Sequence, residues 1–189
     1  MNSLNLETAI KKLAKDREIH LTEMDINQII KYIDTISTYL GQRAYHLMKH
    51  CNRKSINLRD IKNAARIEVK DELSPDLIKY GNYIVTRYFE IRKGYSLEIL
   101  NEVFNYEKLC PSQILLELEI YFPFTYFRDH LKLLKTYQVK YESTIFLVAL
   151  VQSITINILN SLKGMRMEKS NIKIEKILEN YKCHSDYVW

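Results

Sequence analysis

The sequence predicts an all-α protein in which two sets of short, long and short helices pair within one chain. Only 4 Gly and 3 Pro occur among its 189 residues, although tight turns and strained corners prefer these two residue types. Apolar residues recur every three or four positions from residue 4 onward, which is the period of a helix buried on one face. The same order of helix lengths returns after residue 122, which indicates a duplicated architecture.

The first set begins with a short helix that ends near Arg17. A polar connector follows, in which Thr22 or Asp25 can cap the next helix by accepting a backbone N–H. A long helix starts near Ile26 and ends at the polar cluster 52–55, with one apolar stripe along its whole length. A short helix follows at 58–66. An apolar stripe this long must be shielded from water at both ends of the helix. The simplest way to bury it is a second long helix that crosses the first.

The second set follows an extra helix and a linker. Ser74-Pro75 is a good helix start, and residues 90–121 contain two amphipathic helical pieces joined near Cys110-Pro111. Pro123 then opens a short helix, and a polar connector leads to a long apolar helix at 143–164. A second connector precedes the last short helix. We therefore expect three segments, which cover residues 1–90, 91–121 (a helical linker) and 122–189.

Composition argues against several other classes of protein. The net charge is +5, and residues 1–95 carry this whole surplus, which favours polyanionic partners only slightly. The three Cys are widely spaced and indicate neither a zinc site nor a disulfide scaffold. No nucleophile–base pair, metal cluster or phosphate loop is visible, so we expect no enzyme and no cofactor. The most apolar run, 145–162, is interrupted by polar residues, so we expect no membrane span.

Residues 52–66, NRKSINLRDIKNAAR, resemble the second loop and third helix of the core histone family, and are closest to histone 2B. The segment DELSPDLIKYGNYIVTRY resembles the extra C-terminal helix of that histone. The second half is similar to histone 2A at 122–123, 137–146 and 172–181. A 2B-like unit before a 2A-like unit in one chain resembles the fused histone doublets of large DNA viruses.

The resemblance implies two histone folds joined in a handshake, with the first loop of one unit beside the second loop of the other. It implies packaging of double-stranded DNA with a histone 3–histone 4-like partner, in the virion and in a viral factory or the host nucleus. Loops and helix ends of this family bind phosphates without reading bases. The matching DNA-contacting positions are Lys11, Lys12, Lys15, Thr22, Arg53, Lys54, Ser55, Arg128, Lys132, Lys135, Lys140, Lys169 and Lys173.

Further roles follow from the same resemblance. Arg53 is expected to pair with Asp60 and so to pin the second loop to the third helix. The positions expected to face the partner chain are Cys51, Asp60, Arg66, Tyr187 and Trp189.

The sequence also departs from the family. The acidic positions where other proteins dock on histone 2A fall on Gln152, Asn157 and Asn160, so we expect that acidic surface to be absent or neutral. A loop arginine that enters the minor groove corresponds to Asn171, and basic tails are not expected. These departures leave open a histone-fold subunit of the transcription- or replication-factor kind, which binds mainly protein. A helical viral structural protein without a DNA role is the third interpretation.

Overall fold

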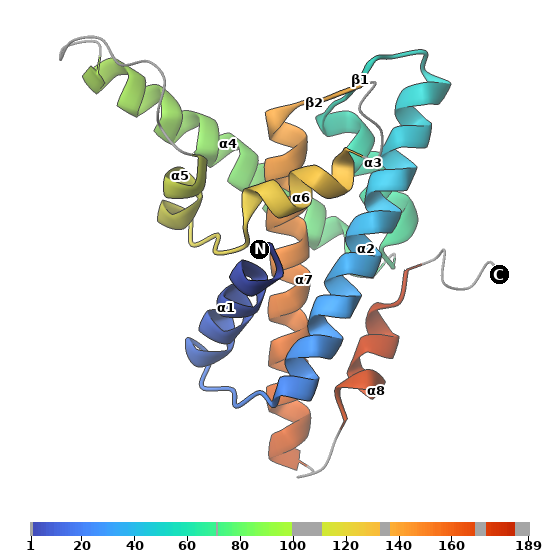
Figure 1. Ribbon diagram of the computed structural model, residues 1–189, viewed down its shortest axis with the longest axis vertical. Coiled ribbons are helices and arrows are strands. Elements are labelled where there is room, and N and C mark those ends of the chain that lie inside the picture. The colour runs from blue at the N-terminus through green and yellow to red at the C-terminus, as the bar shows by residue number, and fades with distance from the viewer. Residues whose placement is uncertain (1, 71, 100–110, 133–136, 169–172, 184–189) are drawn as a thin grey trace.

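The computed structural model describes residues 2–70, 72–99, 111–132, 137–168 and 173–183 (Figure 1). Within these ranges the chain forms eight α-helices, one short 3-10 helix and two strands of two residues each. The predicted all-α class is confirmed.

The first set consists of α1 (Asn2–Lys15), α2 (Glu23–His50) and α3 (Leu58–Glu68). Both α2 and α3 begin with a reciprocal cap. The Thr22 hydroxyl accepts the Asp25 N–H at 3.1 Å, and the Asp25 carboxylate accepts the Thr22 N–H at 2.9 Å. Asn57 and Asp60 form the same arrangement at the start of α3. Because each cap satisfies two N–H groups that have no partner within the helix, it fixes where the helix begins.

The second set consists of α6 (Phe124–Leu131), α7 (Tyr141–Glu168) and α8 (Ile174–Leu178), the last continued by the 3-10 turn η1 (Glu179–Tyr181). The residues before α6 and α8 are Pro123 and Lys173, and neither makes a side-chain cap. The predicted short, long and short order is therefore present twice, and α7 extends beyond its predicted range of 143–164 at both ends.

Between the two sets lie α4 (Ser74–Ile99) and α5 (Pro111–Glu117). The start of α4 at Ser74 agrees with the prediction. The helix then passes without a break through residue 90, where the sequence suggested a boundary, and Cys110 lies outside the described residues.

The core is built around α7, which packs against α2, α3, α4, α6 and α8 (Figure 1). Every residue from Ser143 to Gln152 is buried. The helix is long and apolar enough by composition to cross a membrane, with a mean hydropathy of 1.9 in its most apolar window. The polar residues that interrupt this run therefore do not lower its hydropathy below that of a membrane-crossing helix. Within the protein 72% of that window is buried, because neighbouring helices cover the apolar sides of α7.

The two sets are joined by a parallel bridge between β1 (Ser55–Ile56) and β2 (Gln138–Val139), with Ser55 opposite Gln138 and Ile56 opposite Val139. The Gln138 N–H donates to the Lys54 carbonyl and the Lys140 N–H to the Ile56 carbonyl, both at 3.0 Å. The second loop of the first set thus lies beside the first loop of the second set. The sequence did not predict that these loops form strands.

A second junction lies at the other end of the long helices (Figure 1). The connector between α1 and α2 meets the last turns of α7, where Lys163 donates to the Arg17 carbonyl at 2.8 Å. Arg166 donates to the His20 carbonyl at 2.6 Å and to the Asp25 carboxylate at 2.8 Å. The two sets are therefore tied to each other at both ends.

Candidate nucleic-acid interface

The bridge between β1 and β2 presents an exposed polar face. Successive side chains of a strand point to opposite sides, and Ile56 points into the core with no exposed surface. Gln138 is exposed and Ser55 is half-buried, so these paired residues form the outer side. Lys54 and Lys140 flank the ladder and are both exposed. The bridge therefore brings together two predicted DNA-contacting lysines that are far apart in the sequence.

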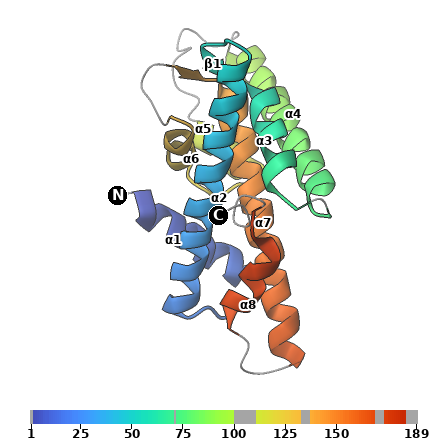
Figure 2. The same cartoon turned by 90° about the vertical axis from the view of Figure 1, so that its right-hand side faces the viewer.

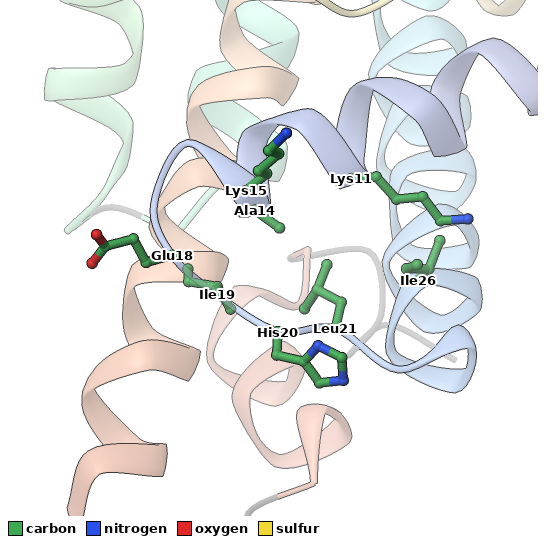
Figure 3. Close-up of a pocket in the computed structure, with 8 residues that line it drawn as sticks. All are labelled: Lys11, Ala14, Lys15, Glu18, Ile19, His20, Leu21 and Ile26. Atoms are coloured by element: carbon green, nitrogen blue, oxygen red, sulfur yellow. The ribbon is translucent and has the colours of Figure 1, made fainter.

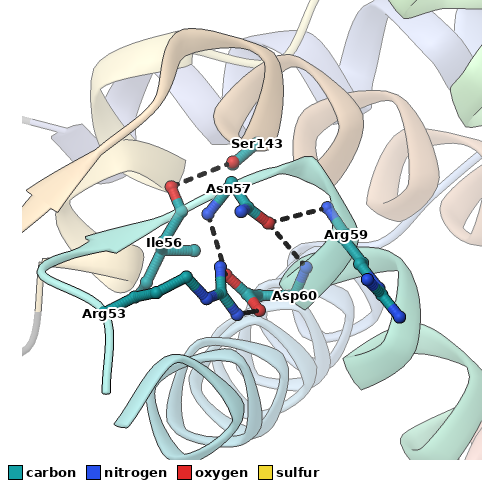
Figure 4. Close-up of polar contacts among 6 residues, drawn as sticks. All are labelled: Arg53, Ile56, Asn57, Arg59, Asp60 and Ser143. Atoms are coloured by element: carbon teal, nitrogen blue, oxygen red, sulfur yellow. Dashed lines mark hydrogen bonds and ion pairs between the residues drawn. The ribbon is translucent and has the colours of Figure 1, made fainter. Parts of the chain in front are cut away.

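Arg53 and Asp60 form the predicted ion pair beneath this bridge (Figure 4). The guanidinium donates to both carboxylate oxygens, one of them at 2.7 Å, and the Asn57 N–H donates to the same carboxylate at 2.9 Å. The hydrogen bond to Asp60 is the main reason that the pKa of Arg53 is raised. Asp60 is 2% exposed, so its predicted role of facing a partner chain is wrong. Its contacts hold the loop onto α3.

The three lysines of α1 are exposed, but two of them also make contacts within the chain. Lys11 pairs with Glu7, and this hydrogen bond raises the pKa of Lys11. Lys12 Nζ lies 3.9 Å from the centre of the Tyr121 ring, a cation–π contact with the segment before α6. Lys11 and Lys15 line a hollow between α1 and the connector, and Glu18 points away from them (Figure 3).

Thr22 is exposed, but its hydroxyl already takes part in the cap of α2. It accepts the Asp25 N–H and also donates to the Asp25 carboxylate at 2.9 Å. Burial alone would raise the pKa of Asp25, but hydrogen bonds from Arg166 and Thr22 outweigh it and lower that pKa. Thr22, Arg166 and the exposed Lys173 line one groove. Sequence reasoning missed Arg166, and only its place in a basic connector hinted at a role there.

The remaining predicted residues divide into three groups. Lys132, Cys51 and Arg66 are exposed, and Arg66 donates to the Asn63 side chain at 3.2 Å. Arg128 is half-buried, and its Nε has no hydrogen-bond partner within the described part of the chain. Four predicted residues lie outside the described residues, and they are Lys135, Lys169, Tyr187 and Trp189.

Most of the predicted DNA-contacting lysines that are described and exposed belong to elements on one side of the molecule. Figure 2 shows α1, α6 and the strands along one side, whereas α3 and α4 lie along the other. We use the name basic face for the exposed lysines that lie in or directly beside α1, α6 and the strands, and they are Lys11, Lys12, Lys15, Lys54, Lys132 and Lys140.

Gln152, which corresponds to an acidic docking position of histone 2A in the resemblance, does not lie on the surface. Its side chain is 1% exposed. The Oε1 atom accepts the N–H groups of Tyr121 at 2.8 Å and Phe122 at 3.2 Å, while Nε2 donates to the Glu119 carbonyl at 2.8 Å. The residue therefore fixes the segment that enters α6. Asn160, by contrast, is exposed as expected.

A polar cluster that sequence reasoning missed fastens α6 to α2. The Tyr126 hydroxyl donates to Asp34, and His130 Nδ1 donates to the Tyr126 carbonyl at 3.0 Å. His130 Nε2 also lies 3.4 Å from Asp34 Oδ1. Burial, followed by the hydrogen bond to Asp34, raises the pKa of Tyr126. The helices approach closely because Gly41 has no side chain, since a Cβ there would lie 2.5 Å from the His130 carbonyl oxygen.

No group of three or more His, Cys, Asp or Glu side chains that could hold a metal ion occurs among the described residues. The sequence matches no model of a known protein family and no curated protein. The geometry of the basic face and the residues that form it are therefore the basis for a functional assignment.

Proposed function

We propose that the chain binds double-stranded DNA as two paired histone folds, a 2B-like unit followed by a 2A-like unit. In this proposal it packages DNA with a histone 3–histone 4-like partner, as a viral histone doublet. The observation that carries the proposal is the parallel bridge, because it joins the second loop of one set to the first loop of the other. Lys54 and Lys140 flank this bridge, and both are exposed.

Three further features support this assignment. The short, long and short order occurs twice, and the two long helices, α2 and α7, contact each other. The segment 52–66 has the sequence that resembles a histone loop and third helix, and the Arg53–Asp60 pair holds that loop in place. A loop held in one conformation presents its lysines without further loss of backbone entropy when it binds.

The chemistry of the basic face suits phosphate groups rather than base edges. Its cations come from helix surfaces and from a two-strand bridge, and long lysine side chains contact a backbone as point charges. Binding of this kind does not depend on base sequence and weakens steeply as salt rises. The first half of the chain carries the positive surplus, and Arg128 in the second is half-buried. We therefore expect the first set to supply most of the affinity.

A salt series of DNA binding, measured by fluorescence anisotropy, tests the proposal. The variant Lys54→Glu/Lys140→Glu should bind more weakly, and its plot of log affinity against log salt should be shallower by about two phosphate contacts. Lys31→Glu/Lys176→Glu is the matched control, because both of its lysines are exposed and lie outside the basic face. Tight binding to one base sequence that persists at high salt contradicts the proposal.

The packaging role has its own test. The chain is reconstituted with a histone 3–histone 4 complex and DNA, and the product is digested with nuclease. Packaging predicts protected fragments of regular length. If the chain is a viral packaging protein, we expect to find it in virions and in the viral factory or the host nucleus. Immunolabelling of infected cells checks this location.

A second candidate is a histone-fold subunit, of the transcription- or replication-factor kind, that binds mainly protein. It is favoured by the contacts that already engage three of the predicted cations, since Lys11 pairs with Glu7, Lys12 covers Tyr121 and Arg53 pairs with Asp60. This candidate predicts a tight complex with a protein partner, weak DNA binding and no protected fragments after digestion.

A further inference from the structure

The corner between the end of α3 and the start of α4 has cations that the basic face does not include. Arg66 and Lys79 line a pocket of about 410 Å³ there, together with Ser74, Pro75, Ile78 and Asn82. Both cations are exposed, and none of these lining residues is acidic. We call this pocket, with Lys62 beside it, the α3–α4 corner.

Two cations and no acidic residue line the pocket, and the exposed Glu72 of the α3–α4 connector does not line it. Lys62 lies one turn before Arg66 on α3, and its pKa is lowered first by burial and then by the charge of Arg66. The nearby acidic residue of α3, Glu68, is 1% exposed and forms an ion pair with Arg43 of α2 at 2.7 Å. Its carboxylate therefore faces the interior of the protein. Asp76 is exposed at the start of α4 but does not line the pocket. The corner is therefore attractive to anions.

The lining of the pocket combines the apolar residues Pro75 and Ile78 with the polar residues Ser74 and Asn82. Ser74 is buried at the start of α4, and Asn82 Oδ1 is buried without a hydrogen-bond partner among the described residues. A guanidinium and an ammonium that line one pocket match the several acceptor oxygens of a phosphate group.

The corner and the basic face lie on different sides of the protein. Figure 2 shows α3 and α4 on the side away from α1, α6 and the strands. We propose that the α3–α4 corner binds the phosphate backbone of a second DNA segment, so that one chain bridges two duplexes. This inference rests on the proposed DNA binding by the basic face. It gives Arg66, which the resemblance assigned to a protein interface, a different role.

Nucleic acid fits this corner better than a protein surface does. The centre of a protein interface is depleted in lysine and other charged residues, whereas this pocket carries two exposed cations beside the apolar residues Pro75 and Ile78. Exposed apolar groups occur on the same helices, namely Ile67 and Tyr83. An acidic protein segment that contacts them is the competing occupant, and the experiment below separates it from DNA.

The test compares two readouts on the full chain. Bridging is measured by energy transfer between donor-labelled and acceptor-labelled short duplexes, and binding to a single duplex by fluorescence anisotropy. For Arg66→Glu/Lys79→Glu we expect bridging to fall about tenfold while single-duplex affinity stays within about twofold, because the basic face is unchanged. Arg66→Gln/Lys79→Gln should give an intermediate loss. Lys31→Glu/Lys176→Glu is again the control, and thermal unfolding shows that each variant is folded.

Each contrary outcome has a distinct meaning. A wild-type chain that binds one duplex but does not bridge two, or an Arg66→Glu/Lys79→Glu variant that bridges as well as wild type, overturns the inference alone. A variant that keeps bridging but loses binding to a histone 3–histone 4 complex makes the corner a protein interface and also overturns it. A wild-type chain that binds no duplex contradicts the proposed function itself.

Discussion

The two helix sets have the same layout but differ in how their helices begin. In the first set, polar contacts fix the ends of the helices, through the caps at Thr22 and Asn57 and the ion pair between Arg53 and Asp60. In the second set, α6 and α8 start without a side-chain cap, and α7 is buried continuously over 143–152. The comparison teaches that the same arrangement of helices can begin its helices with side-chain caps in one copy and without them in the other.

The two long helices also differ in their place in the molecule. α7 has α2 and α3 on its flanks and is also covered by α4, whereas part of α2 faces outward (Figure 1). A helix covered on several sides becomes apolar all round, and a helix covered on one side keeps a stripe. The outward side of α2 is free to carry charged residues.

The largest expected effect comes from breaking the ion pair between Arg53 and Asp60 in the first set, which we call the polar lock. Arg53→Ala leaves the carboxylate of Asp60 charged and buried without its partner, which should lower the free energy of unfolding by about 3 kcal/mol. Urea denaturation followed by circular dichroism measures this change. Arg59→Ala is the control on the same helix, because Arg59 is exposed and should change stability by less than about 0.5 kcal/mol. Equal losses in the two variants contradict the polar lock.

The second set has one polar contact of comparable weight, at Gln152. Gln152→Leu deprives the N–H groups of Tyr121 and Phe122 and the carbonyl of Glu119 of their partner. Since each buried polar group without a partner costs about 1–3 kcal/mol, we expect a loss of about 2–3 kcal/mol in urea denaturation.

Two other substitutions sharpen this test. Gln152→Glu keeps an acceptor for the two N–H groups and should recover part of the stability. Asn160→Leu, at an exposed position of the same helix, should have an effect of less than about 0.5 kcal/mol. If Gln152→Leu is as stable as Asn160→Leu, the contact at Gln152 does not fix the segment before α6.

The glycines of the two long helices should respond with opposite signs. A Cβ at Gly41 would lie 2.5 Å from the His130 carbonyl oxygen, whereas at Gly164 it meets no atom within 4 Å. Gly41→Ala should therefore destabilise the protein by about 1–3 kcal/mol, because the backbone of α6 must move. Gly164→Ala should stabilise it by about 0.5–1 kcal/mol, because alanine restricts the unfolded chain and favours the helix. Thermal unfolding of both variants checks the signs.

The smallest expected effect is a pH dependence at the junction of the α1–α2 connector with α7. The pKa of Asp25 is lowered from its ordinary value of 3.8, so the ionised form stabilises the fold above that value. This contribution is lost as the pH falls through the lowered pKa. Asp25→Asn should be less stable than wild type by about 1 kcal/mol at neutral pH. The difference should shrink below about pH 4 in urea denaturation, and a difference that is constant with pH contradicts the assignment.

Much of the fold could be predicted because its signals are local. The spacing of apolar residues gave the order of the helices, and Ser74 marked the start of α4. The sequence also offered Thr22 and Asp25 as candidate caps of α2. In the structure Thr22 is the cap and Asp25 is its reciprocal partner. The Arg53–Asp60 pair was expected from a resemblance over one short segment, in which the two residues are seven positions apart.

The sequence by itself therefore determined the helical class, the two sets and the position of the basic loop. Only the tertiary structure decided that β1 and β2 pair in parallel, that Gln152 is buried, that Asp60 faces the core and that Arg66 and Lys79 share a pocket. The physical reason is the range of the interactions. Helix periodicity and caps depend on neighbours within a few residues, whereas a bridge between residues 55 and 138 depends on how the long helices pack.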